Sequence, residues 1–374
     1  MKNREKLKVL MIGKFMPPPY GGIEQHVLGL YDELKLHVNY KLILISNDNN
    51  TDDNIILVPS IFKYRGFSFA PLVYLKIKSV IDEFKPDLVH IHSPNPLIEI
   101  YVSFIKNIPI ICTWHSDIIG YKYLYFCYRY FQKIFIKKIT KFIIPTNSHL
   151  LSFKQLKNVS KNKINIIPLG IDYDYYQKKT DPKLIPNNIL NIVKQDFILS
   201  VGRLVKYKNY EKLITTFRNI KTKHILIIAG NGSELIKLKN IIKLNKLEKK
   251  VFILTNCTKE VLRYLYQKST FFILPSNTQA EAFGLSSAEA MASGKSTIVC
   301  NLHNGVNVLN VLNKTSLYFN DSKKNHLKNQ VESLLSDTKM RKKFEKNAKL
   351  HIKNNFTIKL MAKKTLKLYH SLKK

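Results

Sequence analysis

The segment FFILPSNTQAEAFGLSSAEAMASGK, residues 271–295, begins as a short apolar run and continues into a helix-like pattern. A run such as FFILP (271–275) is typical of a strand that is buried on both faces of a parallel sheet. The following loop contains Glu281, Gly284 lies near the expected helix start, and Glu289 lies on the helix. This strand–loop–helix unit predicts an α/β fold with ligands beyond the carboxyl ends of the strands.

The same alternation of apolar runs and helical patterns continues along the chain in two series. The first series of expected strands is 8–15, 41–46, 87–92, 108–113 and 141–146, and the second is 196–202, 224–230, 251–255, 271–275 and 296–300. Helical stretches such as 23–36, 72–84 and 96–105 separate them. Alternation of this kind indicates doubly wound sheets, so two series predict two Rossmann-like domains.

A stretch of weak periodicity at 173–194 separates the two series. We therefore expect an N-terminal domain over residues 1–178 and a C-terminal domain over 190–352. The remaining residues, 353–374, end in a helix expected near 357–372. With two facing domains of this type, the cleft between them is the expected active site.

The charge is strongly basic, with 61 Lys and Arg against 26 Asp and Glu and a formal net charge of +35. Such a balance attracts nucleic acid, anionic lipid or phosphorylated substrates. The preference for Lys over Arg, together with abundant Ile and Asn, is also what an AT-rich coding sequence gives. Charge alone therefore does not choose among these partners.

The four cysteines, Cys112, Cys127, Cys257 and Cys300, lie at no metal-ligand spacing. We expect them to be reduced, buried residues of a cytosolic protein. Nothing in the sequence has the pattern of a signal peptide, and no apolar stretch approaches the roughly 20 residues of a membrane-spanning helix.

Small and polar residues follow the expected strands of the first domain. Gly21 and Gly22 precede a helix, where a ligand can approach the backbone, but they do not form the GxGxxG pattern of a nicotinamide site. His115 and Asp117 follow another strand and are candidates for the active site. An ordinary turn and a structural histidine are the alternatives.

His90 and His92 lie two residues apart on an expected strand and therefore face the same way. A zinc site would need a third ligand, and none lies near them in sequence. We expect these two side chains to line the cleft or pack within it.

In the second domain, Arg203 and Lys208 just past a strand suit a diphosphate. The carboxylates of Glu281 and Glu289 can each accept hydrogen bonds from neighbouring sugar hydroxyls, and the helix start between them can take phosphates. Solvated surface side chains are the alternative. The pair Asp172 and Asp174 could hold a divalent ion, but it lies at the domain boundary, so no metal site is expected.

Taken together, the motifs resemble the retaining glycosyltransferase family 4, which has the two-domain GT-B fold. The resemblance rests on GGIEQHV (21–27), VHIHSP (89–94), TWHSD (113–117), PLGID (168–172), SVGRLVKYKNYEKLI (200–214) and EAFGLSSAEAMASGK (281–295). TWHSD and NLHNGV (301–306) look most like bacterial enzymes of O-antigen and exopolysaccharide assembly.

The resemblance implies transfer of a hexose from a nucleotide-diphosphate sugar, with retention and without a metal or other cofactor. It implies that the N-terminal domain binds the acceptor, that the C-terminal domain binds the donor, and that the last helix crosses back to the first domain. The implied catalytic residues are His115, Glu281, Arg203 and Lys208, and the implied donor-binding residues are Gly21, Gly22, Arg203, Lys208, Glu281, Phe283, Gly284, Leu285 and Glu289. GDP-mannose is the favoured donor by this resemblance, with UDP-hexoses left open.

A basic, aromatic segment over 121–142 lies in the first domain, within a stretch from Ile118 to Ile171 that has no Asp or Glu. Such a helix can lie in the headgroup layer of an anionic membrane. We therefore expect a peripheral protein at the cytoplasmic face of the membrane, with a lipid-diphosphate-linked glycan as acceptor. A core-facing helix with a solvated lysine face is the alternative.

Three other functions remain as alternatives, and the motifs fit one of them, a sugar-nucleotide epimerase of similar fold, less well. A basic nucleic-acid-binding protein would explain the charge, but not Glu281 and Glu289 beside a strand end, so no nucleic-acid partner is expected. A non-catalytic GT-B scaffold would not need the intact Arg203, Lys208 and two glutamates.

Overall fold

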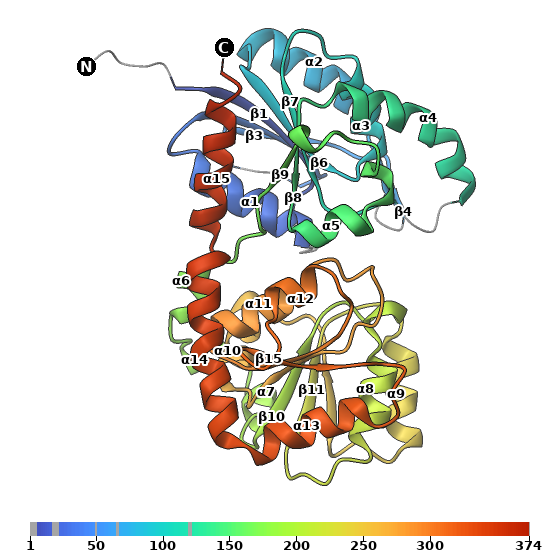
Figure 1. Cartoon of the computed structure of the whole chain (residues 1–374), viewed down its shortest axis with the longest axis vertical. Coiled ribbons are helices and arrows are strands. Elements are labelled where there is room, and N and C mark those ends of the chain that lie inside the picture. The colour runs from blue at the N-terminus through green and yellow to red at the C-terminus, as the bar shows by residue number, and fades with distance from the viewer. Residues whose placement is uncertain (1–5, 17–21, 49–50, 65–66, 119–121, 374) are drawn as a thin grey trace. The chain divides into compact units, whose positions relative to one another are not determined.

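A computed structural model describes residues 6–16, 22–48, 51–64, 67–118 and 122–373 of the chain (Figure 1). It divides into two compact units. The first unit combines Met1–Gly170 with Ile358–Lys374, and the second is Ile171–Thr357.

The first unit contains parallel strands joined by helices. Its elements are β1 (Lys8–Phe15), α1 (Gly22–Leu34), β2 (Asn39–Ile45), β3 (Ile55–Val58), β4 (Phe62–Tyr64), β5 (Phe67–Phe69), α2 (Val73–Phe84), β6 (Leu88–Ser93), α3 (Pro96–Ser103), β7 (Ile110–Trp114), α4 (Lys122–Lys138), β8 (Lys141–Ile144), α5 (Asn147–Ser152), β9 (Ile164–Ile166) and α15 (Ile358–His370).

Seven of these strands form a parallel sheet in the order β3-β2-β1-β6-β7-β8-β9, and β4 and β5 form a separate antiparallel pair. Two apolar clusters cover the two faces of the sheet. Side chains of α1 and α15 belong to one cluster, and side chains of α2, α3 and α4 belong to the other. This three-layer arrangement explains why the strands are apolar on both faces.

The second unit repeats this construction. Its elements are α6 (Tyr173–Gln177), α7 (Asn187–Ile192), β10 (Phe197–Val201), α8 (Tyr210–Phe217), β11 (Ile225–Ala229), α9 (Leu235–Leu244), β12 (Val251–Leu254), α10 (Lys259–Lys268), β13 (Phe272–Leu274), α11 (Leu285–Ala292), β14 (Thr297–Cys300), α12 (Gly305–Leu309), β15 (Ser316–Phe319), α13 (His326–Ser336) and α14 (Thr338–Asn355).

Its six-stranded parallel sheet has the order β12-β11-β10-β13-β14-β15. Numbered within the unit, this is 3-2-1-4-5-6, the order of a Rossmann fold. The order reverses between β10 and β13, and in the first unit it reverses between β1 and β6. Ligands of doubly wound sheets bind beyond the strand ends at such switch points. Two Rossmann-like units of this kind are what the sequence predicts.

The boundaries of the units differ from those expected from sequence. The first unit ends at Gly170 and not near 178, because Asp172 already caps α6, which packs on α11 of the second unit. The chain returns to the first unit at Ile358, after α14 has ended. In the first unit, α15 packs against α1 (Figure 1).

The cysteines are all free thiols, as expected, but they are not all buried. Cys112 and Cys300 are buried, Cys257 is half-buried, and Cys127 is exposed on α4. The expectation of burial is wrong for Cys127, because it lies on the solvent-facing side of α4. Several aromatic side chains of this helix are exposed as well.

Candidate functional site

A buried ion pair lies at the switch point of the second unit. Lys208 follows β10 and Glu281 follows β13, and these two strands are neighbours in the sheet. The Lys208 Nζ lies 2.5 Å from Glu281 Oε2, and the two side chains are only 9% and 10% exposed. Ser276 Oγ also donates to Glu281 Oε2, at 2.7 Å. The topology therefore joins two predicted site residues that are 73 positions apart.

The loops that hold this pair depend on close backbone contacts. A Cβ atom on Gly230, after β11, would lie 1.9 Å from the carbonyl oxygen of Gly202, after β10, so only glycine fits there. On the other side, Asn304 caps α12 and donates from Nδ2 to the Glu281 carbonyl oxygen at 2.8 Å. These contacts fix the backbone on both sides of the ion pair.

The start of α11 follows Glu281 directly. Gly284 is the N-cap residue with φ +80°, a left-handed conformation that favours glycine. Phe283 is buried and packs against Phe356, with ring centroids 5.9 Å apart, so only its backbone remains for a ligand. Leu285 begins the helix and is half-buried. The first amides of a helix have no acceptor within it and attract anions.

Glu289 is buried one turn further along α11. Tyr266 donates its hydroxyl to Glu289 Oε2 at 2.7 Å, and the Tyr176 hydroxyl bonds to the same carboxyl group. Burial raises the pKa of Glu289, while these two hydroxyls and the charge of Lys208 oppose that rise. Glu281, Glu289 and Lys208 thus form one electrostatically coupled group.

Arg203 is placed differently from the other predicted cation. It is exposed, and its Nη2 lies 3.3 Å from the Tyr207 hydroxyl. The ring of Tyr207 in turn lies 5.5 Å from Lys208 Nζ. Arg203 is therefore linked to Lys208 through an aromatic side chain, not by a direct contact.

Three histidines meet at the switch point of the first unit. His26 comes from α1, His92 from the end of β6, and His115 follows β7. His92 Nδ1 and His115 Nε2 are 3.1 Å apart, and the ring of His26 lies edge-on to both at 5.3 and 4.9 Å between centroids. All three side chains are buried.

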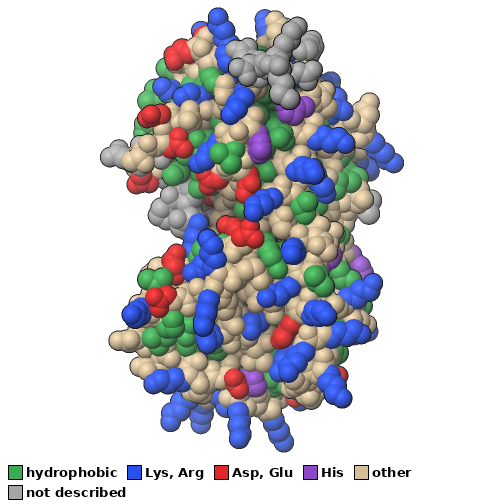
Figure 2. Space-filling model, turned by 90° about the vertical axis from the view of Figure 1, so that its left-hand side faces the viewer, with side chains coloured by type: hydrophobic (Ala, Val, Ile, Leu, Met, Phe, Trp, Pro, Cys, Tyr) green, Lys and Arg blue, Asp and Glu red, His purple; other side chains and the backbone are tan. Residues whose placement is uncertain are grey.

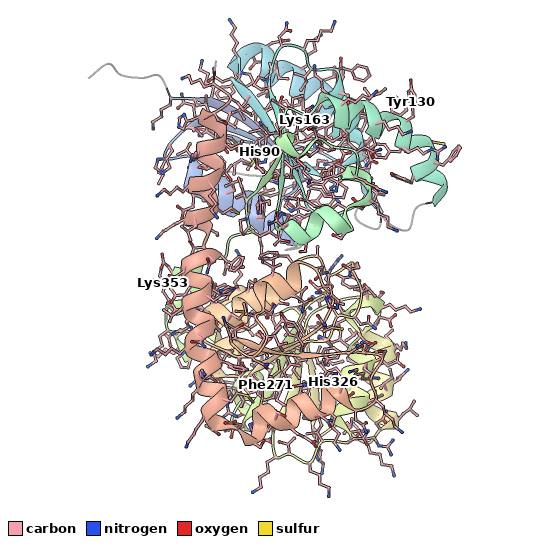
Figure 3. All side chains as sticks on the ribbon, in the orientation of Figure 1. His90, Tyr130, Lys163, Phe271, His326 and Lys353 are labelled. Atoms are coloured by element: carbon pink, nitrogen blue, oxygen red, sulfur yellow. The ribbon has the colours of Figure 1, made fainter. Side chains whose placement is uncertain are left out.

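His90 lies beside this group but is tied to the C-terminal helix. Its Nδ1 lies 2.6 Å from the Tyr369 hydroxyl, and its Nε2 lies 2.8 Å from Thr113 Oγ1. The Tyr369 hydroxyl also contacts that of Tyr40 at 2.8 Å. His90 therefore packs inside the unit, and its contact with Tyr369 holds α15 against the sheet. Figure 3 labels His90 within the first unit.

Burial keeps these imidazoles neutral. It lowers the pKa of His26 to about 4 and that of His90 to about 3. The pKa values of His92 and His115 are also held well below the ordinary value, first by burial and then by the neighbouring imidazoles. At neutral pH this site presents uncharged nitrogen atoms.

The other candidate residues have more local surroundings. Asp117 accepts a hydrogen bond from Trp114 Nε1 at 3.0 Å, so it orients the indole. Asp172 caps α6 by accepting from the Tyr175 amide at 2.9 Å. Gly22 is the exposed first residue of α1, whereas Gly21 lies outside the described residues.

The basic helix α4 presents an aromatic face to solvent. Phe126, Tyr130, Phe131 and Ile134 are exposed, at 63%, 66%, 42% and 42%. Figure 3 labels Tyr130 on this helix. Its inner side is anchored by buried Phe135 and by the Tyr128 hydroxyl, which donates to buried Glu99. Within the described part of the chain, none of the helices is long and apolar enough to cross a membrane.

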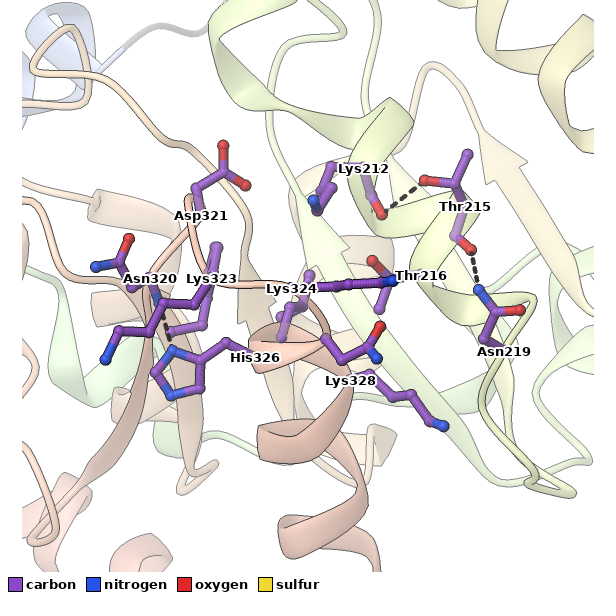
Figure 4. A pocket seen from close by; sticks show the side chains of 13 residues that line it. Lys212, Thr215, Thr216, Asn219, Asn320, Asp321, Lys323, Lys324, His326 and Lys328 are labelled. Atoms are coloured by element: carbon purple, nitrogen blue, oxygen red, sulfur yellow. Dashed lines mark hydrogen bonds between the residues drawn. The ribbon is translucent and has the colours of Figure 1, made fainter.

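Positive charge is not confined to α4. Figure 2 shows Lys and Arg side chains over both units on the face in view. A separate lysine-rich pocket lies beside α8 and the start of α13, where His326 Nδ1 accepts from the Asn320 amide at 3.0 Å (Figure 4). It contains none of the residues predicted for the site.

Sequence reasoning missed five residues of these sites: His26, Tyr176, Tyr207, Tyr266 and Ser276. His26 lies within the quoted GGIEQHV motif, but only the fold shows that it meets His92 and His115. The other four carry ordinary hydroxyl groups with no distinctive spacing.

Comparison with known families agrees with this architecture. Residues 183–351 match the family described as glycosyl transferases group 1, and residues 20–175 match the one described as Glycosyltransferase Family 4. The first match includes both switch-point strands of the second unit, β10 and β13, and the second match includes α1, β6 and β7 of the first unit but not β1.

Similar proteins include O-antigen chain mannosyltransferase C of Escherichia coli, 22% identical, with 98% of this chain and 99% of that one covered. Another, from Campylobacter jejuni, is N-acetylgalactosamine-N,N'-diacetylbacillosaminyl-diphospho-undecaprenol 4-alpha-N-acetylgalactosaminyltransferase. It is 28% identical over 56% of this chain and 55% of its own. The crystal structure of Anabaena HepE in complex with UDP-glucose has a TM-score of 0.79 at 17% identity, covering 98% of this chain and all of that one (100%).

Proposed function

The chain belongs to glycosyltransferase family 4, and we propose that it moves a hexose, with retention, from a nucleotide-diphosphate sugar to a lipid-linked glycan. The product would be part of a surface polysaccharide such as O-antigen. The names of the Escherichia coli and Campylobacter jejuni relatives support this class of product and acceptor.

The observation that carries the proposal is the Lys208–Glu281 pair at the switch point of the second unit. Beside it lie the start of α11 and the buried carboxyl group of Glu289. A helix start and a lysine suit the two phosphates, and the carboxylates suit the vicinal hydroxyls of a hexose and a ribose. The second unit therefore offers groups for the diphosphate and for the sugar hydroxyls of a nucleotide sugar.

In the proposed reaction, the bond between the anomeric carbon and the β-phosphate oxygen breaks while the acceptor hydroxyl bonds to that carbon on the same face. The hydroxyl proton passes to the departing phosphate. Negative charge develops on that phosphate, and Lys208, Arg203 and the amides of α11 would stabilise it. For this, the Lys208 ammonium must turn from Glu281 towards the phosphate, which leaves Glu281 free to hold the sugar.

Because protein groups would neutralise the charge on the departing phosphate, we propose no catalytic metal or other cofactor. It also keeps His115 beside the transferred sugar, a role that follows from the family resemblance. The neutral state of this imidazole suits a hydrogen bond to a sugar hydroxyl.

We favour GDP-mannose as donor, and a thermal-shift screen against GDP-, UDP- and dTDP-sugars tests the choice. A bound donor raises the melting temperature because it binds only the folded unit. GDP-mannose should give the largest shift, and Lys208→Met should abolish it. A shift with UDP-hexoses alone would replace the donor, and no shift with any nucleotide sugar would contradict the proposed function.

For the acceptor, we propose that α4 holds the protein on the anionic inner face of the cytoplasmic membrane. Exposed Phe126 and Tyr130 can enter the headgroup layer while Arg129 and Lys133 contact the phosphates. Each basic residue near such a surface contributes about 1 kcal/mol.

Flotation with vesicles that contain anionic lipid tests this surface. Replacing Arg129, Lys133 and Lys137 with Gln should weaken binding strongly, whereas the same change at exposed Lys339, Lys342 and Lys346 on α14 should have a much smaller effect. Equal losses in the two variants would mean that the overall charge, and not α4, binds the membrane.

A further inference from the structure

The histidine group of the first unit has the composition of a metal site. One ring nitrogen from each of His26, His92 and His115 lies within 4.8 Å of the other two. The proposed transfer reaction requires only His115 among them. The convergence of the other two imidazoles is therefore left without a role in that reaction.

The spacing between two of the three rings is close to that of nitrogen ligands on one ion. His92 Nδ1 and His115 Nε2 are 3.1 Å apart. Two imidazole nitrogens at about 2.0–2.1 Å from a tetrahedral zinc ion are separated by about 3.3 Å. The His26 ring makes no hydrogen bond to the described residues, and one of its nitrogens lies within 4.8 Å of a ring nitrogen of each of the other two, so this ring would have to turn toward them to complete the site.

The polar atoms of the group are also incompletely satisfied. Both nitrogens of His26 and Nε2 of His92 are buried and have no hydrogen-bond partner among the described residues. Leaving a buried polar atom without a partner costs about 1–3 kcal/mol. An ion bound through one nitrogen of His26 would offset the share of that cost that falls on His26, and at His92 it would replace the contact of Nδ1 with His115.

We propose that His26, His92 and His115 together bind one divalent transition-metal ion of the zinc class. Imidazole ligands suit Zn²⁺, Co²⁺, Ni²⁺ and Cu²⁺ and do not suit Mg²⁺, which prefers oxygen. This site thus differs in its ligand chemistry from a metal that would bridge a donor diphosphate, which oxygen ligands hold.

The surroundings set the strength of this site. All three ligands are imidazoles, and Lys14 lies close enough for its charge to act on His115. Because none of the three ligands is a carboxylate and a lysine lies close by, no ligand neutralises the positive charge of the ion. We therefore expect an exchangeable ion that chelators remove without unfolding the protein, in contrast to a structural zinc site.

The test is a titration of the tag-free full chain, stripped with a chelator, with Co²⁺ and then Zn²⁺. Binding of Co²⁺ is followed by its visible absorption and by quenching of the fluorescence of Trp114, the single tryptophan, which adjoins His115 in sequence. We expect one Co²⁺ per chain, displaced by Zn²⁺. His26→Phe, which keeps an aromatic ring, should weaken binding at least about 100-fold, since even an outer-shell change typically costs about 10–100-fold.

His351→Asn is the matched control, because His351 lies in the second unit and also has a buried, unpartnered ring nitrogen. It should leave the titration unchanged. Circular dichroism checks the fold, and His26→Asn is the second variant if His26→Phe does not fold. Co²⁺ affinity that is the same in the native chain and in the His26 variants, or the absence of saturable binding, would overturn the proposal. Neither readout uses sugar transfer, so the proposed function is tested separately.

Discussion

The two units place different chemistry at the same position of the same topology. In the second unit, the switch point holds Lys208 and Glu281, two charged groups 2.5 Å apart. In the first unit, it holds His26, His92 and His115, which burial keeps neutral. The fold thus determines where a site forms, and the side chains there determine what it can bind.

The difference also shows two ways of burying titratable groups. A buried charge needs a partner, and Lys208 and Glu281 provide one for each other. A buried imidazole can instead release its proton and stay uncharged. The second unit is therefore suited to an anionic donor. The first unit is suited to ligands that interact with the lone pairs of neutral imidazole nitrogens.

Separating the ion pair should have the largest effect. Lys208→Met leaves the Glu281 carboxylate buried without its cation, which should destabilise the second unit by about 3–5 kcal/mol. Hydrogen exchange of β10 and β13 amides measures this, because Trp114 reports only on the first unit. The double variant Lys208→Met/Glu281→Gln should recover stability but not activity.

An exposed pair in the same unit is the control. Lys237 and Glu211 are 2.6 Å apart but about half exposed, so Lys237→Met should cost at most about 1 kcal/mol. If both methionine variants lost equal stability, burial would not be what distinguishes the switch-point pair.

Removing only the charge of Glu281 should act mainly on catalysis. Glu281→Gln keeps the shape of the side chain but weakens its grip on the donor sugar and its pairing with Lys208. We expect kcat to fall about 10²–10³-fold, the usual effect of losing one transition-state contact. Glu211→Gln is the matched control and should keep native kcat. A Glu281→Gln enzyme within a few-fold of native activity would contradict the proposed role.

Much of the second site could be predicted from sequence because its signals are local. The run FFILP and the glycine of α11 place Glu281 and Glu289, and the strand before Lys208 places that residue at the same sheet edge. Strand order, however, comes from tertiary packing. The direct contact of Lys208 with Glu281 therefore appears only in the folded structure.

The first site could be predicted only in part. His90 and His92 look equivalent in the sequence because they lie two residues apart on one strand. In the structure, His90 contacts Tyr369 from the C-terminal helix, whereas His92 contacts His115. The third histidine, His26, comes from a helix more than sixty positions earlier in the chain. Periodicity identifies which face a residue occupies but not which distant element covers that face.

Weakening the contacts of the C-terminal helix should reduce stability by an intermediate amount, and only in the first unit. Tyr369→Phe removes a hydroxyl that contacts both Tyr40 and His90 and leaves these buried groups without that partner. The expected loss is about 1–3 kcal/mol. Unfolding followed by Trp114 fluorescence measures it, while hydrogen exchange of the second unit should not change. A loss shared by both units would mean that α15 stabilises more than the sheet on which it packs.

The smallest effect is expected at Glu289, and its sign is unusual for a predicted site residue. Because burial raises the pKa of Glu289, the folded unit keeps a proton that the unfolded chain has already released, between the ordinary and the raised value. Stability contributed by this group therefore falls as pH rises through that window. Glu289→Gln has no proton to lose and still accepts the Tyr266 hydroxyl.

The glutamine variant should therefore gain stability relative to the native chain as pH rises from acid to neutral, while its KM for the donor increases. The loss of a hydrogen bond to a charged group corresponds to about a tenfold increase in KM. Melting temperatures across this pH range and donor kinetics at neutral pH measure the two effects. A higher melting temperature of the native chain than of the variant at neutral pH would show that the carboxylate stabilises the fold. Burial of Glu289 at the second switch point would then not reduce stability.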